Sequence, residues 1–150
     1  MKIEEEIKQS KFINEFQKAH INVLFTAAYL NQNVACILKP HNISWQQFNI
    51  LRILRGMGEE PATIKILTER MIDKMSNASR LVEKLKQKGL VERRTCEHDR
   101  RRVDIVITQK GLDLLTQTSE EIDQTFHQQQ MALSEEEALQ LNVLLDKMRG

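Results

Sequence analysis

The segment Asp73–Thr108, DKMSNASRLVEKLKQKGLVERRTCEHDRRRVDIVIT, predicts a helix, a turn and a charged hairpin in quick succession. From Met75 onward, apolar residues recur at the three- and four-residue steps that place them on one face of a helix. Gly89 follows at a position where a residue with positive φ commonly ends a helix. The pattern therefore predicts a helix over Met75–Lys88 with a polar outer face. The expected buried stripe is Met75, Ala78, Leu81, Val82 and Leu85.

The residues after this helix predict a two-stranded hairpin with a basic tip. Leu90–Arg94 is a short strand-like run, Thr95–Arg100 is polar and turn-forming, and apolar residues alternate along Val103–Ile107. Nine Lys or Arg residues and four acids lie between Arg80 and Arg102, although the whole chain has a net charge of only +1. Such a local excess is typical of a phosphate-binding face, since affinity for duplex DNA comes largely from displaced counterions.

The run LTERMIDKMSNASRLVEKLKQKGLVERR, followed by HDRRRVDIVITQKG, resembles the winged helix-turn-helix of the MarR family of bacterial transcription regulators. The match covers Leu67–Gly111 without a gap. The resemblance implies a homodimer that places one recognition helix per subunit in the major groove of double-stranded DNA, and one wing arginine in the adjacent minor groove. The DNA-binding residues expected from it are Lys74, Ser76, Asn77, Arg80, Lys84, Asp99, Arg100, Arg101 and Arg102.

The resemblance assigns different tasks to the wing residues. Asp99 and Arg101 match the family's D-x-R pattern, and Arg101 is expected to enter the narrow minor groove, where negative potential is concentrated. Asp99 is expected to orient the guanidinium of Arg101 in a charge-assisted pair. The family usually has a glycine in the turn before the recognition helix. This chain has Ile72 there, so Asp73 is expected to cap the recognition helix instead.

The segment before this motif predicts two shorter helices. Ser44 and Gln47 fit a capping box that begins the first of them, whose expected core face is Phe48, Leu51 and Leu54. Thr63 is expected to cap the second, which spans Ile64–Met71. This short helix and the one after it form the expected helix-turn-helix pair.

Long apolar seams near both ends of the chain predict helices that pack against other helices. The first runs from Ile13 to Ile37 in steps of three and four, and is expected to end at Lys39 because the residue before Pro40 avoids the helical region. After the hairpin, Thr108 is expected to cap a second long helix. Ser134 then begins a last helix through a capping box.

These elements predict one unit of 150 residues, mainly α-helical with a small β-hairpin. Residues 1–40 and 109–150 are expected to form a helical dimerisation region, and residues 41–108 a winged helix-turn-helix. From Gly111 onward there are eight acids and two bases, so this end should avoid DNA. The N-terminus has no signal-peptide pattern and no stretch is expected to be long enough to cross a bilayer, so the expectation is a cytoplasmic protein without membrane contact.

Members of the family commonly bind a small aromatic effector in a cleft between the dimerisation and winged regions. The resemblance brings His20, Trp45 and Phe48 to such a cleft. For His20 a packing role at a helix contact is favoured over a role as ligand or pH sensor. For Trp45, the only tryptophan, a structural anchor is favoured over stacking on a ligand.

Nothing in the sequence resembles an active site, and no cofactor is expected. The five glycines give neither a phosphate-cradling loop nor a dinucleotide fingerprint. Cys96, His98 and Asp99 include metal-ligand types, but a second spaced pair is missing, so no metal site is assigned. Cys36 and Cys96 are too far apart in sequence to suggest a disulfide framework.

The expected function is therefore that of a sequence-specific regulator, acting as a repressor. It would bind an inverted-repeat operator as a homodimer and be released by a small-molecule effector. Two alternatives stay open: a winged-helix protein-interaction module without DNA binding, and a regulator that senses oxidants through Cys36 or Cys96. Salt-sensitive binding to duplex DNA separates the first alternative from the expected function.

Overall fold

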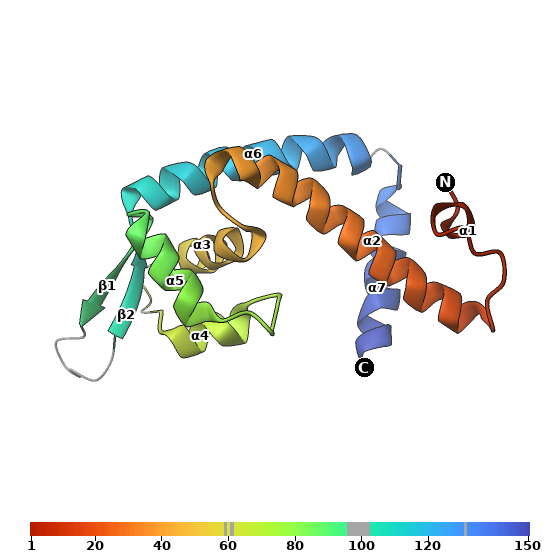
Figure 1. Ribbon diagram of the computed structural model, residues 1–150, viewed down its shortest axis with the longest axis horizontal. Coiled ribbons are helices and arrows are strands. Elements are labelled where there is room, and N and C mark those ends of the chain that lie inside the picture. The colour runs from red at the N-terminus through yellow and green to blue at the C-terminus, as the bar shows by residue number, and fades with distance from the viewer. Residues whose placement is uncertain (59, 61, 96–102, 131) are drawn as a thin grey trace.

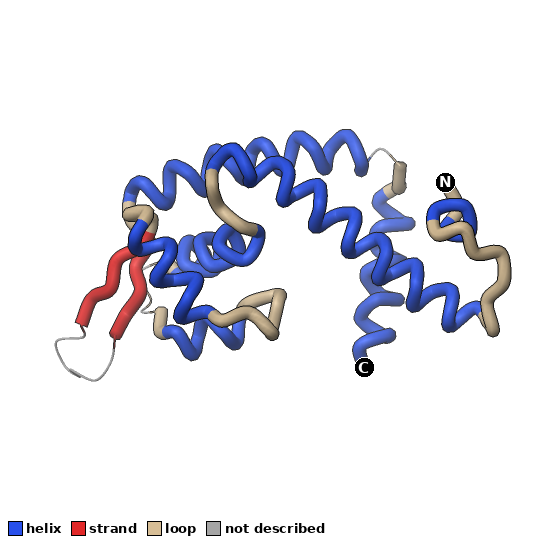
Figure 2. Tube along the Cα trace, viewed as in Figure 1, coloured by secondary structure: helices blue, strands red, loops and turns tan. Residues whose placement is uncertain are grey.

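The computed structural model describes residues 1–58, 60, 62–95, 103–130 and 132–150. The fold is mainly α-helical with two antiparallel strands (Figure 2), as the sequence predicts. Helices α2 and α6 run along the molecule, with the winged part at one end and α1 and α7 at the other (Figure 1). The elements are α1 (Ile3–Glu6), α2 (Glu15–Leu38), η1 (Lys39–His41), α3 (Trp45–Met57), α4 (Ile64–Arg70), α5 (Ala78–Gln87), β1 (Val91–Thr95), β2 (Val103–Ile107), α6 (Gln109–Gln130) and α7 (Glu135–Arg149).

Side-chain caps set where several helices begin. The hydroxyl of Ser44 accepts a hydrogen bond from the backbone N–H of Gln47 at 3.2 Å, and the Gln47 side chain accepts one from the N–H of Ser44 at 3.1 Å. This is the predicted capping box of α3. Thr63 caps α4 by accepting from the N–H of Ile66 at 3.3 Å, and Ser134 begins α7 through a second capping box. All three caps are confirmed.

Helix α5 begins three residues later than predicted. Met75, expected in its buried stripe, is 93% exposed. The carboxylate of Asp73 accepts hydrogen bonds from the N–H of Met75 at 3.0 Å and from the hydroxyl of Ser76 at 2.8 Å. These bonds hold the segment in a turn that competes with helix formation. Asn77 is the N-cap of α5, so the prediction that Asp73 caps this helix is wrong.

Helix α2 begins two residues after the start of the predicted seam at Ile13 and ends one residue before the predicted end at Lys39. Asn14 is its N-cap, and Ile13 therefore lies outside the helix and is 84% exposed. At the other end the α-helix stops at Leu38 and tightens into the 3₁₀ turn η1. Lys39 keeps a helical backbone (φ −57°, ψ −46°), so the expectation that Pro40 forces it out of the helical region is wrong.

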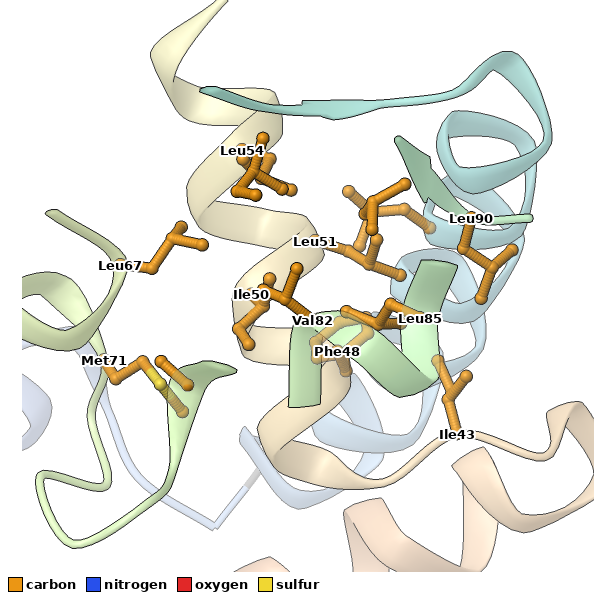
Figure 3. Close-up of a cluster of buried hydrophobic side chains, with 14 of the residues drawn as sticks. Ile43, Phe48, Ile50, Leu51, Leu54, Leu67, Met71, Val82, Leu85 and Leu90 are labelled. Carbon is orange, nitrogen blue, oxygen red and sulfur yellow. The ribbon is translucent and has the colours of Figure 1, made fainter. Parts of the chain in front are cut away.

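The main hydrophobic core lies in the winged part of the molecule. The predicted core residues of α3, Phe48, Leu51 and Leu54, are all buried. Side chains from neighbouring elements, including Leu67 of α4 and Leu85 of α5, point toward them (Figure 3). Each large apolar side chain buried in this way contributes about 1.5–3 kcal/mol relative to an exposed one. This packing fixes α5 against α3.

The base of the hairpin is attached to the helices on either side. Ile105 of β2 is buried, and its N–H donates to the carbonyl of Ala62, just before α4, at 2.7 Å. From β1, the guanidinium of Arg93 lies 3.3 Å from the carboxylate of Glu83 on α5. The wing therefore leaves the core in a fixed direction relative to α5.

The terminal helices expose large apolar side chains. Helix α7 buries none of its residues. Leu139 is 64% exposed, Leu144 63% and Val143 58%. Phe16, near the start of α2, is 83% exposed. The apolar seams predicted at both ends are thus largely uncovered within a single chain.

One helical stretch, Glu15–His41, has the length and apolar composition needed to cross a membrane, with a mean hydropathy of 1.3. The expectation that no stretch is long enough to do so is therefore wrong. Helices that pack against other helices in soluble proteins pass the same test.

Candidate nucleic-acid interface

An open groove of about 350 Å³ runs beside α5 and brings four predicted DNA-binding residues together, namely Ser76, Asn77, Arg80 and Lys84. Gln46 of α3 and Leu81 complete the lining. The groove lies over the start of α5, where the chain leaves the turn held by Asp73.

Arg80 and Lys84 carry the charge of this groove. They lie four residues apart on α5, so their side chains sit one above the other on the same face of the helix. Both are exposed. No described carboxylate forms an ion pair with either, in contrast to Arg93, which is paired with Glu83. Two unneutralised cations on an exposed helix face suit contact with phosphate or with the base edges of DNA.

The polar residues before α5 are partly used by the protein itself. Oδ1 of Asn77 accepts a hydrogen bond from the N–H of Arg80 at 3.0 Å, which leaves the Asn77 amide nitrogen as a donor. The hydroxyl of Ser76 donates to Asp73. The Lys74 ammonium donates to the backbone carbonyl of Glu69, at the end of α4. These contacts order the segment on which Asn77 stands.

Asp73 links this segment to α3. Its carboxylate accepts hydrogen bonds from Ser76, from the Gln46 side chain at 3.4 Å and from the N–H of Met75. Together these bonds hold the pKa of Asp73 below its ordinary value, with the Ser76 hydroxyl as the largest cause. The role of Gln46 could not be predicted from the sequence, because its contact joins residues 27 positions apart that no local pattern connects.

The remaining predicted wing residues, Asp99, Arg100, Arg101 and Arg102, lie outside the described residues, as do Cys96 and His98 of the metal-site alternative. Among the residues that the structure describes, no three His, Cys, Asp or Glu side chains gather into a metal-binding group. Cys36 is exposed on α2 and forms no disulfide bond with another described residue.

A second cavity, of about 590 Å³, lies between α2, α3 and α6. Trp45 and Phe48 line it as expected, with stacked rings whose centroids are 5.9 Å apart. His20 does not line it. That residue is exposed on α2, two turns before Ala27, the earliest residue of α2 to reach the cavity. The full lining is Ala27, Leu30, Asn31, Val34, Trp45, Phe48, Arg52, Arg55, Ile72, Ser119, Ile122, Asp123 and Phe126.

Arg52 and Arg55 are cavity residues that the sequence analysis missed. Trp45, Phe48, Arg52 and Arg55 follow one another along α3 in steps of three, four and three. This helical spacing indicates that all four lie on one face of α3. The two arginines place positive charge beside an apolar, aromatic wall. Ser119 of α6 adds a buried hydroxyl without a hydrogen-bond partner among the described atoms.

Comparison with known proteins places these features in a family. Residues 43–103 match the family model described as the MarR family. Over 113 residues the chain is 31% identical to the HTH-type transcriptional regulator MgrA of Staphylococcus aureus, and the alignment covers 75% of this chain and 74% of MgrA.

Two solved structures share the fold. The MepR–DNA complex of S. aureus has a TM-score of 0.74 and 24% identity, with 90% of this chain and 96% of MepR covered. The organohalide-sensing regulator RdhR, in its 2,4-dichlorophenol-bound form, has a TM-score of 0.78 and 24% identity, covering 91% of this chain and 80% of RdhR. Together with the match to MgrA over about three quarters of both chains, the matched segment and the winged fold show that this chain belongs to the MarR family of DNA-binding transcription regulators.

Proposed function

We propose that this protein is a cytoplasmic repressor that binds an inverted-repeat operator as a homodimer. The observation that supports this most directly is the convergence of Asn77, Arg80 and Lys84 in one groove beside an exposed helix face. Arg80 and the amide of Asn77 have the donors needed to contact base edges, whereas Lys84 suits a phosphate. MepR, which has the same fold, was solved as a DNA complex.

The wing extends this contact in the proposal. Arg101 enters the adjacent minor groove, Asp99 orients it, and Arg100 and Arg102 lie against the backbone phosphates. The sequence order and the local excess of positive charge support these roles. The fixed base of the hairpin gives the wing a defined direction from α5.

Residues 1–40 and 109–150 form the dimerisation region in this proposal. The exposed Leu139, Val143 and Leu144 of α7 and the exposed Phe16 of α2 support it, because such apolar surface is costly in a soluble monomer. The same reasoning assigns the apolar stretch Glu15–His41 to contact with a partner subunit instead of lipid. A two-fold dimer presents two recognition helices, so the operator half-sites lie about 34 Å apart.

The cavity between α2, α3 and α6 is the proposed effector site. Trp45, Phe48 and Phe126 provide aromatic surface, and the two arginines Arg52 and Arg55 outnumber the one carboxylate in the lining, that of Asp123. A small aromatic compound with an acidic group, such as a phenol, matches both features. RdhR, which shares the fold, was solved with 2,4-dichlorophenol bound. Occupation of this cavity would change how α3 sits against α2 and α6, and thus the position of α5.

Selection of bound duplexes from a random pool by the full chain tests the DNA-binding proposal. An enriched inverted repeat is the expected result. Recovery of no duplex would instead favour a protein-interaction module without DNA binding, and equal recovery of all duplexes would contradict a sequence-specific repressor.

The effector proposal has an intrinsic probe, because Trp45 is the only tryptophan and lines the cavity. Titration with 2,4-dichlorophenol should quench its fluorescence in a saturable way and release the selected operator. Exchange of Arg52 for Gln should weaken both effects together. Quenching that stays linear with concentration would exclude this cavity as the site for the compound.

A further inference from the structure

A third groove, of about 620 Å³, lies on the other side of Trp45 from the effector cavity, where the end of α2, η1, the start of α3 and α5 meet. Only Trp45 and Asn31 line both cavities. Three of its residues, Gln46, Leu81 and Lys84, also line the groove beside α5. Its full lining is Asn31, Ala35, Lys39, Asn42, Ile43, Ser44, Trp45, Gln46, Gln47, Leu81, Lys84 and Lys88.

Three lysines line this groove and no acidic residue does. Lys84 and Lys88 lie four residues apart on the same side of α5 and its C-cap, about 6 Å along the helix axis. Lys39 faces the groove from η1. No described carboxylate pairs with any of the three, although ion pairs such as Lys18–Glu4 form elsewhere in the chain. The groove therefore concentrates positive charge that the protein does not neutralise.

Lys88 is held in place toward this groove. Its ammonium donates to the backbone carbonyl of Asn42 and to Oε1 of Gln47, the latter at 3.3 Å. Both acceptors are neutral, so they orient the ammonium without cancelling its charge. Burial and the nearby charge of Lys84 hold the pKa of Lys88 below its ordinary value. An anion between the two ammonium groups would relieve this repulsion.

Backbone donors lie in the same wall. The capping box of α3 uses the N–H groups of Ser44 and Gln47, but no described acceptor reaches those of Trp45 and Gln46. Trp45 and Gln46, whose N–H groups have no described acceptor, thus line the same groove as the three lysines. This combination suits a compact oxyanion of high charge better than a single carboxylate.

We propose that this groove binds a phosphate group through Lys39, Lys84 and Lys88. The phosphate comes either from a small phosphorylated molecule or from the backbone of bound DNA, since Lys84 also faces the proposed DNA groove. A ligand here bridges η1 and α5. It therefore connects the proposed dimerisation region to the helix that carries Arg80.

The first test uses the full chain without DNA and pyrophosphate as the probe. Isothermal titration at constant ionic strength should give saturable binding of one pyrophosphate per chain. Lys39→Gln should weaken it about tenfold or more, the loss expected for one charge-assisted contact. Lys86→Gln is the matched control, because Lys86 is exposed on α5, about 200° around the helix from Lys84 and Lys88. It should leave pyrophosphate binding unchanged.

The second test asks whether the phosphate belongs to DNA. If it does, Lys39→Gln lowers affinity for all duplexes alike and reduces the salt dependence of binding by about one phosphate contact, while pyrophosphate binds the free protein only weakly. If the source is a small molecule, pyrophosphate binds tightly and the salt dependence does not change. The proposal would be overturned if Lys39→Gln bound pyrophosphate as the unmodified chain does and also showed the same salt dependence of DNA binding. The pyrophosphate experiment contains no DNA, so its outcome does not depend on the proposed repressor function.

Discussion

The carbonyl oxygen of the Asn77 side chain accepts a hydrogen bond from the backbone N–H of Arg80 at 3.0 Å. A residue that the family resemblance assigns to DNA contact is thus also the cap that begins α5. The side-chain oxygen of Asn77 satisfies a backbone N–H at the start of the helix, and its amide nitrogen remains available as a donor. A substitution that removes the whole Asn77 side chain should therefore affect both the stability of α5 and the proposed DNA contact.

These two tasks can be separated by two substitutions. Asn77→Ala removes the cap and should lower the free energy of unfolding by about 1 kcal/mol. Asn77→Asp keeps the accepting oxygen and should retain that stability, but it removes the amide donor and so lowers the preference for operator DNA. Chemical denaturation and binding to operator and unrelated duplexes measure the two effects. Equal stability of Asn77→Ala and the unmodified chain would show that the cap contributes nothing.

Local side-chain chemistry explains why some helix boundaries could be predicted and one could not. The caps at Ser44, Thr63 and Ser134 each depend on residues within three positions, which the sequence displays directly. The start of α5 depends on Asp73, which is held by Gln46 from another helix as well as by its own neighbours. Helical periodicity alone does not reveal that competition.

In the candidate sites, too, features that depend on one helix could be predicted, whereas features that depend on contacts between helices could not. Arg80 and Lys84 were predictable because exposed positions on a single helix follow from its spacing. The cavity depends on how α2, α3 and α6 cross, so the sequence did not show that Arg52 and Arg55 reach it. His20 and Ala27 belong to one seam, yet they lie about 10 Å apart along α2, and only Ala27 reaches the cavity.

Gly111 should be intolerant of any side chain. A Cβ atom there would lie 2.2 Å from the carbonyl oxygen of Leu90 and 2.8 Å from Cγ1 of Ile107, at the junction of α6 with the hairpin. Gly111→Ala should therefore lower the free energy of unfolding by about 1–3 kcal/mol. Gly56→Ala is the control, since Gly56 lies within α3 with no atom within 4 Å of the added carbon. Thermal unfolding should show Gly56→Ala unchanged or more stable; equal loss in both variants would contradict this packing.

The contact between His41 and Glu121 should make the free energy of unfolding depend on pH. Nε2 of His41 lies 2.9 Å from Oε2 of Glu121, joining η1 to α6, and Gln117 donates to the other oxygen at 3.1 Å. The hydrogen bond from His41 is the largest cause that holds the pKa of Glu121 below its ordinary value of 4.5, and the bond from Gln117 also lowers it. The resulting stabilisation is fully present above pH 4.5 and is lost as the pH falls through the lower folded-state pKa.

Glu121→Gln should therefore lose less stability than the unmodified chain when the pH is lowered from about 6 to about 3. Denaturant unfolding at several pH values measures this. Glu120→Gln serves as the control, because Glu120 is exposed and has no partner among the described residues. If the two variants have the same acid dependence as each other, the His41–Glu121 contact does not set it.

The exposed face of α7 should be required for assembly. Leu144→Glu places a charge in the proposed subunit interface and should shift the monomer–dimer equilibrium strongly toward monomer, since burial of a leucine is worth about 1.5–3 kcal/mol. Gln87→Glu adds the same charge at an exposed position of α5, outside the proposed dimerisation region, and should leave the dimer intact. Sedimentation velocity at micromolar concentration distinguishes them. An unmodified chain that sediments as a monomer would remove the basis for this interface.

The proposed function requires α5 to read a specific DNA sequence through Arg80, which is exposed and has no ion-pair partner among the described residues. The most direct measurement is the affinity for the selected duplex and for a scrambled duplex across a range of salt concentrations, for the unmodified chain and Arg80→Ala. The logarithm of affinity should fall linearly with the logarithm of salt concentration, by about 0.9 per phosphate contact. Arg80→Ala should lose about 1–3 kcal/mol of discrimination between the two duplexes. Equal affinity of the unmodified chain for both duplexes at every salt concentration, or unchanged discrimination in Arg80→Ala, would contradict this account.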